Sequence, residues 1–190
     1  MAKGIIFTGI KHCGKSTQGR ILAKRLGWAF FDTDDMIQEE TGRSPRQIYS
    51  EEGIETFMKH ELYTCQILAE KINSGLNLVI ATGGGICNNS KAIKILRDVG
   101  QILFLQTPEE VAANRIIKEI VFEEGKMLGL PAYIASENPK TEADVRQIFS
   151  KFYHQRCKIY KEIAHKVCVL GEEKKEFNSE KIWLAIQSFL

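Results

Sequence analysis

The segment 9–16, Gly-Ile-Lys-His-Cys-Gly-Lys-Ser, carries the side chains of this sequence best suited to bind a phosphate. It has the pattern GxxxxGK[ST], and it lies between an apolar run at 4–8 and a helical pattern at 15–26. The two glycines let successive backbone N–H groups surround a phosphate, and the positive end of the following helix points at the same anion. Lys15 can reach the β- and γ-phosphates, and the Ser16 hydroxyl can ligate Mg²⁺. The residues expected to bind nucleotide here are Gly9, Lys11, His12, Cys13, Gly14, Lys15, Ser16 and Thr17.

Within this loop, His12 and Cys13 are unusual. We interpret both as spacers, because only the glycines, the lysine and the serine carry the phosphate chemistry. A catalytic imidazole or thiol at these positions is the alternative.

Two carboxylates, Asp32 and Asp34, follow a second apolar run at 28–31. Phosphoryl transfer needs an acid that organises the metal and a group that orients the acceptor hydroxyl. Residues i and i+2 of an extended backbone project to opposite sides. We therefore expect Asp32 to face Mg²⁺ and Asp34 to act catalytically on an acceptor. The alternative is that Asp34 or Asp35 only caps the next helix.

Five short apolar runs, at 4–8, 28–31, 77–81, 101–105 and 166–170, alternate with helical patterns. They are apolar throughout rather than at every second position, which is typical of a parallel sheet covered on both faces. Helix signals support this division: Gly27 ends the pattern at 15–26, and Pro108 is expected at the first position of another helix. The pattern predicts an α/β fold with a five-stranded parallel sheet, helices on both faces and right-handed crossovers.

Two connections are longer than a crossover requires. The segment 33–73 is predicted to hold a short helix at 34–41 and a long one from about residue 51, whereas 121–138 is rich in glycine and proline without clear periodicity. Ligands bind at the carboxyl ends of the strands in such sheets. We therefore expect substrate-binding helices in the first segment and a lid in the second.

Composition narrows the classes of function. The 190 residues are 44% apolar and have a net charge of +2, which predicts one folded domain over 1–190 and argues against nucleic acid or anionic membranes as partners. No stretch approaches the roughly 20 apolar residues of a membrane span, and the N-terminus does not resemble a secretory signal. Five cysteines without a CxxC pair predict reduced thiols in a cytoplasmic protein and no cysteine-bound metal. Without a heptad pattern, a monomer is the default expectation.

Further motifs extend along the chain in a recognisable order. After the loop at 9–17 come Asp32-Thr33-Asp34, a Thr-Gly-Arg-Ser segment at 41–44, a segment containing Gly53, Phe57 and Glu61, three glycines at 83–85, and the pattern Arg156-x-x-x-Tyr160-x-x-x-Ala164. In these respects the sequence resembles the shikimate kinases, small P-loop kinases of the nucleoside-monophosphate-kinase type.

The resemblance implies a P-loop NTPase three-layer sandwich that uses ATP and Mg²⁺ to phosphorylate a hydroxyl of shikimate or a related hydroxy acid, a step of aromatic amino acid biosynthesis. By resemblance, Asp34 would bind ring hydroxyls and assist deprotonation, and Asp32 would hold Mg²⁺ through water. The backbone amides of Gly83, Gly84 and Gly85 would approach the substrate or a phosphate closely; a flexible loop is the alternative. Arg115 would stack on adenine; a solvated helix arginine is the alternative.

Arg156 has independent support, because it lies within an apolar stripe at helical spacing in 145–163. An inward guanidinium is costly unless it meets an anion. A clamp on an acceptor carboxylate fits this requirement, and an ion pair with a carboxylate of the protein is the alternative.

Two departures from the family pattern concern cations. The arginine expected after Phe57 is Met58, which lies on an apolar stripe and is predicted to pack in the core. The lid motif Arg-Pro-Leu-Leu is here Leu-Pro-Ala-Tyr at 130–133. Lys118, Lys126, Lys140 or Arg146 could supply the missing lid charge. The acceptor could also be a different polyol acid, or the chain a nucleotide-binding regulator with little turnover.

Overall fold

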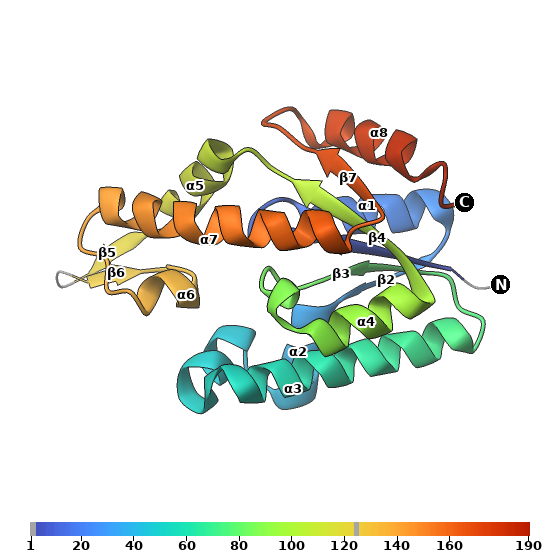
Figure 1. Cartoon of the computed structure of the whole chain (residues 1–190), viewed down its shortest axis with the longest axis horizontal. Coiled ribbons are helices and arrows are strands. Elements are labelled where there is room, and N and C mark those ends of the chain that lie inside the picture. The colour runs from blue at the N-terminus through green and yellow to red at the C-terminus, as the bar shows by residue number, and fades with distance from the viewer. Residues whose placement is uncertain (1–2, 124–125) are drawn as a thin grey trace.

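The computed structural model describes residues 3–123 and 126–190, and its centre is a five-stranded parallel sheet (Figure 1). The strand order is β2-β3-β1-β4-β7, and all four pairings are parallel. The strands are β1 (Gly4–Thr8), β2 (Ala29–Asp32), β3 (Leu78–Ala81), β4 (Gly100–Gln106) and β7 (Lys166–Val169). The predicted parallel sheet is confirmed, with strand ends that shift by no more than one residue.

Helices cover both faces of this sheet and complete three layers (Figure 1). Helices α1 (Lys15–Leu26) and α8 (Lys175–Ile186) pack against each other on one face, and α3 (Pro45–Asn73), α4 (Ser90–Val99) and α7 (Glu142–Ile163) lie on the other. Strands β1 and β3 are buried along their whole length, as the uninterrupted apolar runs predict. Strand β7 instead exposes Val167 and Val169, because it forms an edge of the sheet.

The segment after β2 forms two helices, as predicted, but the second begins earlier. Helix α2 (Thr33–Thr41) follows the strand directly, and α3 starts at Pro45 rather than near residue 51. Ser44 and Gln47 form a capping box at that start, with proline at the first helical position. Gly53 then interrupts α3 with φ 85° and ψ 172°, a backbone conformation that favours glycine. The capping signal at 44–47 was therefore available in the sequence.

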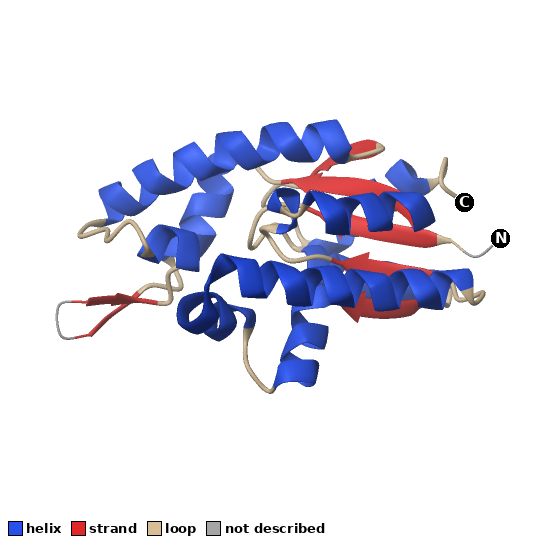
Figure 2. Cartoon of the chain, turned by 60° about the horizontal axis from the view of Figure 1, so that its bottom comes forward, coloured by secondary structure: helices blue, strands red, loops and turns tan. Residues whose placement is uncertain are grey.

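The segment 121–138 is more regular than its sequence suggests. Strands β5 (Val121–Glu123) and β6 (Lys126–Leu128) form an antiparallel hairpin, and α6 (Ala132–Ala135) leads on toward α7. Figure 2 shows this hairpin extending away from the sheet. Helix η1 (Ile86–Asn88) follows β3, and α5 (Glu109–Ile117) follows β4. Pro108 is the N-cap of α5 rather than its first helical residue, so that prediction was wrong by one position. In the described part of the chain, no helix is long and apolar enough to cross a membrane.

Candidate active site

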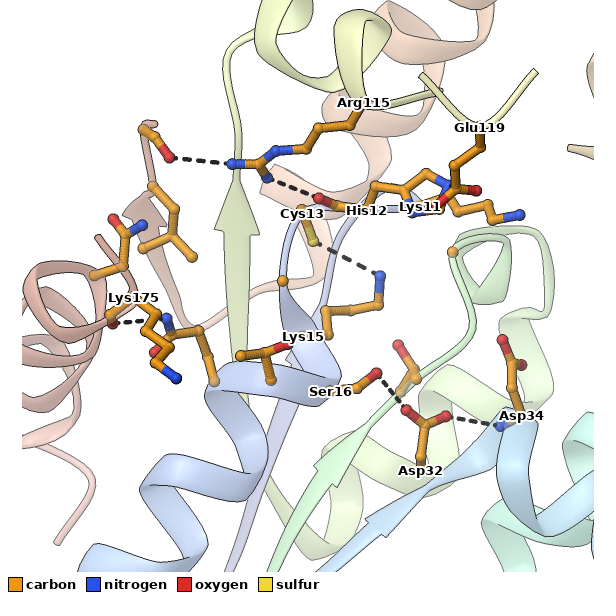
Figure 3. Close-up of a pocket in the computed structure, with 18 of the residues that line it drawn as sticks. Lys11, His12, Cys13, Lys15, Ser16, Asp32, Asp34, Arg115, Glu119 and Lys175 are labelled. Atoms are coloured by element: carbon orange, nitrogen blue, oxygen red, sulfur yellow. Dashed lines mark hydrogen bonds and ion pairs between the residues drawn. The ribbon is translucent and has the colours of Figure 1, made fainter. Parts of the chain in front are cut away.

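The phosphate-binding loop joins β1 to α1 at the carboxyl end of the sheet (Figure 3). Gly9 has φ 147°, and a Cβ atom there would lie 2.6 Å from the carbonyl oxygen of Leu105, so a side chain does not fit. Gly14 is the N-cap of α1, which leaves the first N–H groups of that helix free to bind an anion. The loop lines a cavity of about 640 Å³.

Lys15 and Ser16 follow the loop on the first turn of α1. The Lys15 ammonium is buried and donates hydrogen bonds to the carbonyl oxygens of Gly9 (2.9 Å) and Ile10 (2.8 Å), so it lies beneath the loop that would hold phosphate. The Ser16 hydroxyl donates to Asp32 Oδ2 at 2.5 Å. A hydroxyl and a carboxylate oxygen on one wall of a phosphate cavity fit Mg²⁺, which takes few protein ligands and completes its shell with phosphates and water. The described residues contain no group of three or more His, Cys, Asp or Glu side chains that could hold a metal ion.

Asp32 and Asp34 have different surroundings. Asp32 Oδ1 accepts a hydrogen bond from the Asp34 backbone N–H (3.0 Å), so Asp32 caps α2 and Asp34 lies within the helix. The expected alternation along an extended strand was therefore wrong, because the helix begins at Thr33. The two side chains nevertheless lie in different places. Asp32 borders only the cavity lined by the phosphate-binding loop, called the nucleotide cavity below, whereas Asp34 also borders a second cavity. The Asp34 Oδ1 atom is buried without a hydrogen-bond partner, and burial together with the Asp32 charge raises the pKa of Asp34 to about 6.

The second cavity, of about 460 Å³, lies between α2, α3, α6 and α7 and contains Arg156. The Arg156 side chain is buried, and its Nη1 atom donates to the carbonyl oxygen of Gly84 (3.2 Å). Its guanidinium stacks on the Tyr133 ring, 4.0 Å from the centroid. Arg156 forms no ion pair with a described carboxylate, and its Nε atom has no hydrogen-bond partner among the described residues. These contacts disfavour an internal ion pair and leave the guanidinium for an anion in the cavity.

The three glycines after β3 have different positions. Gly84 borders both cavities, and a Cβ atom there would lie 2.8 Å from the backbone nitrogen of Lys11. Gly85 borders the second cavity. Gly83 borders neither: its N–H donates to Thr33 Oγ1 (3.0 Å), so the structure uses this amide inside the protein rather than toward a substrate.

Sequence and structure comparisons identify the family that shares this arrangement. The sequence profile described as shikimate kinase matches residues 11–187. A shikimate kinase of Clostridium botulinum is 32% identical over 171 residues, 90% of each chain. The chain belongs to the shikimate kinase family.

Other shikimate kinases match over shorter segments. The relative from Chlorobium chlorochromatii is 35% identical over 112 residues, and that from Moorella thermoacetica is 36% identical over 115 residues. These matches span 59% and 60% of this chain but only 57% and 64% of the relatives' lengths, less than two thirds in both cases.

Solved shikimate kinases have the same fold. The structure from Acinetobacter baumannii in complex with shikimate has a TM-score of 0.77 at 27% identity, covering 99% of this chain and 94% of that one. The structure from Aquifex aeolicus has a TM-score of 0.72 at 26% identity, covering 97% and 96%. The fold is therefore the P-loop NTPase three-layer sandwich that the resemblance implied.

In this member of the shikimate kinase family, Arg115 braces the phosphate-binding loop. Its Nη1 atom donates to the carbonyl oxygen of His12 (2.8 Å), and Nη2 donates to that of Gly171 (3.4 Å), as Figure 3 shows. The His12 ring lies 3.1 Å from Glu119, and burial lowers the pKa of the imidazole. Cys13 is buried beneath the loop. Arg115 is thus tied to the nucleotide cavity, which it borders, rather than free in solvent.

Two residues of α3, Met58 and Glu61, line the second cavity of this shikimate kinase homologue. Met58 is half-buried and lines the cavity, so the prediction that it packs in the core was wrong; the face of α3 that carries it borders a cavity rather than the sheet. Glu61, one turn further on, is 1% exposed. Its Oε2 atom accepts from Asn89 Nδ2 (3.0 Å), its Oε1 atom has no partner among the described residues, and burial raises its pKa to about 7. In the sequence, Glu61 is a carboxylate among apolar residues at helical spacing, and this pattern was the signal that could have pointed to it.

The structure also tests the candidates for the missing lid cation of this family member. Lys118 borders the nucleotide cavity. Arg146 instead donates to Asn114 (2.7 Å), and Lys140 is exposed; neither borders a cavity described here. The Lys126 side chain lies outside the described residues. The sequence analysis also missed five residues that follow β7 and line the nucleotide cavity. Only the position of this edge strand in the folded sheet brings them there. They are Leu170, Gly171, Glu173, Lys175 and Asn178.

Proposed function

We propose that this chain is an ATP- and Mg²⁺-dependent kinase that transfers the γ-phosphoryl group to a hydroxyl of shikimate or a related hydroxy acid. The observation that carries the proposal is that two cavities meet at shared residues. One contains a phosphate-binding loop, and the other contains an unpartnered carboxylate and a buried arginine. This arrangement suits the transfer of a phosphoryl group between a nucleotide and a negatively charged alcohol.

The roles follow from the contacts. The amides of the loop and Lys15 hold the phosphates, and Ser16 and Asp32 hold Mg²⁺, which neutralises phosphate charge when bound. With a pKa of about 6, Asp34 is mostly ionised at neutral pH and can accept a hydrogen bond from the acceptor hydroxyl. Arg156 binds the acceptor carboxylate. Catalysis then rests on positioning and electrostatic stabilisation.

The same proposal assigns roles to larger segments. Residues 33–73 form the acceptor-binding helices of a single domain over 1–190, and 121–138 form a lid whose closure excludes water from the phosphoryl group. Arg115 contacts the adenine. We also propose a cytoplasmic location, which is supported by five buried cysteines, none of them in a disulfide. A monomer is proposed as the default state, because the sequence has no heptad pattern.

Met58 favours a second candidate, a kinase for a hydroxy acid other than shikimate. Where the family pattern has an arginine, this cavity has a thioether beside the aromatic rings of Tyr49 and Phe57. Besides Arg156 and Lys11, the exposed Arg46 borders the same cavity and is a candidate for the second arm of the clamp. An acceptor with less negative charge, or with an added apolar group, would also fit this wall.

A coupled assay of ADP release tests these alternatives with the full chain, ATP, Mg²⁺, shikimate and a panel of hydroxy acids. We expect release with shikimate and a loss of at least about 100-fold in kcat/KM in Asp34→Asn. Asp98→Asn, an exposed change on α4, is the matched control. Release only with another hydroxy acid selects the second candidate. Nucleotide binding without acceptor-dependent release of ADP overturns both and indicates a regulator.

A further inference from the structure

Lys11 occupies the boundary between the two cavities. Among the described residues, three border both cavities, namely Lys11, Asp34 and Gly84, and Lys11 is the cation of this set. The backbone nitrogen and Cα of Lys11 lie 2.8 and 3.2 Å from the point that a Cβ atom on Gly84 would occupy. The loop therefore packs directly against the acceptor side, and the Lys11 side chain begins where the cavities meet.

The ammonium group of Lys11 is available to a ligand. Its Nζ atom forms neither an ion pair nor a hydrogen bond with another described residue, whereas the Lys15 ammonium is bound to two carbonyl oxygens of the loop. The Lys11 charge acts on both sides of the boundary. It offsets a small part of the rise in the pKa of Asp34 that burial and the Asp32 charge cause, and it adds to the fall in the pKa of His12 that burial causes. In Figure 3 the Lys11 side chain extends on the side of the loop where Asp34 lies, away from Lys175.

A phosphoryl group that moves from the nucleotide to the acceptor passes this boundary. Negative charge is spread over its equatorial oxygens in the transition state, and a cation fixed at that point stabilises the charge without reorganising. Residues 130–133, which lie in the proposed lid, contain no arginine. Lys118 borders the nucleotide cavity but not the second cavity, where the acceptor would bind and which is called the acceptor cavity below. Among the described residues, Lys11 is the cation that borders both cavities, so it is the one placed to supply charge at this point.

We propose that Lys11 is a catalytic residue whose ammonium contacts the phosphoryl group during transfer and replaces the missing lid cation. The inference rests on the proposed function. In the step, a bond forms between the acceptor oxygen and the γ-phosphorus, and the bond from that phosphorus to the bridging oxygen of ADP breaks. ADP keeps the electron pair of the broken bond, Asp34 receives the hydroxyl proton, and Lys11 stays protonated throughout.

Steady-state kinetics of Lys11→Met test this role, with Lys11→Arg as the conservative variant. We expect Lys11→Met to lower kcat by about 100-fold or more while both KM values change less than about threefold, and Lys11→Arg to restore most of the loss. Lys140→Met, the same change at an exposed position bordering neither cavity, is the control. A Lys11→Met enzyme with unchanged kcat overturns the proposal, as does one that only raises the KM for ATP.

A binding measurement without acceptor separates this proposal from the proposed function. Calorimetry would compare the affinity for MgADP with and without aluminium fluoride, which mimics the transferring phosphoryl group. We expect aluminium fluoride to increase the affinity for MgADP by a factor at least about tenfold larger in the wild type than in Lys11→Met. Without aluminium fluoride, the two proteins should bind MgADP with equal affinity. Equal tightening in both overturns the role of Lys11, whether or not shikimate is phosphorylated. Unequal tightening in a protein that phosphorylates no acceptor supports Lys11 and refutes the proposed kinase.

Discussion

Replacing Glu61 by glutamine should make the protein more stable at neutral and alkaline pH. Glu61 is 1% exposed, its Oε1 atom has no hydrogen-bond partner in the described chain, and the nearby Asp34 charge adds repulsion. Burial raises its pKa from 4.5 to about 7, so the folded state retains a proton that the unfolded chain releases. Stability from this group is therefore complete below pH 4.5 and is lost as the pH rises to about 7.

The magnitude follows from these two pKa values. Their difference corresponds to about 3 kcal/mol of unfolding free energy, and for a chain of this size to about 6–12 °C in Tm. Glutamine keeps the volume and can accept the Asn89 hydrogen bond, but it does not ionise. We expect Glu61→Gln to match the wild type near pH 4 within about 1 kcal/mol and to exceed it by about 3 kcal/mol at pH 8.

The assay is denaturant unfolding of the wild type and Glu61→Gln between pH 4 and 8, with the difference in free energy plotted against pH. Titrating groups that do not interact with Glu61 cancel in this difference, and the interaction with Asp34 is part of the effect that is measured. Glu70→Gln, an exposed change on the same helix, should give a difference near zero at every pH. A Glu61→Gln difference that does not vary with pH would refute the reasoning, because it would show that the folded protein accommodates the Glu61 carboxylate as well as water does.

Two further changes test the cavity walls. Met58→Arg adds a cation to the acceptor cavity near Glu61, at the position where the family pattern has an arginine, and it should lower the KM for shikimate about 10- to 100-fold in the ADP-release assay; an unchanged or higher KM would argue against a carboxylate in this cavity. Gly84→Ala puts a methyl group 2.8 Å from the Lys11 nitrogen and should cost about 1–3 kcal/mol in thermal unfolding, whereas Gly85→Ala, with nothing within 4 Å, should cost little. Equal destabilisation by the two alanines would contradict the packing of the loop on Gly84.

Local patterns were sufficient to predict much of this fold. The uninterrupted apolar runs placed the strand ends to within one residue, and Lys15–Leu26 was predicted with both of its ends. These features depend on residues close in sequence: a buried central strand is apolar on both faces, and a glycine at each end of α1 permits the turn. The start of α3 was predicted too late although its capping box is equally local.

Contacts between distant segments could not be predicted in this way. Periodicity showed that Met58 and Glu61 share one face of α3, but not that this face borders a cavity closed by α6 and α7. The spacing of Asp32 and Asp34 correctly predicted that their side chains lie in different places, but for the wrong reason. They differ because Asp32 ends β2 and caps α2 while Asp34 lies inside α2, not because side chains alternate along a strand.

The sequence alone determined the phosphate-binding loop and the alternation of strands and helices, because each depends on the backbone preferences and hydrophobicity of neighbouring residues. Only the tertiary structure decided which charges have partners. The ammonium of Lys15 and the guanidinium of Arg115 are bound to carbonyl oxygens, whereas one oxygen each of Asp34 and Glu61 has no partner in the described chain. The reason is physical: whether a buried charge is neutralised depends on groups that folding brings together from distant parts of the chain.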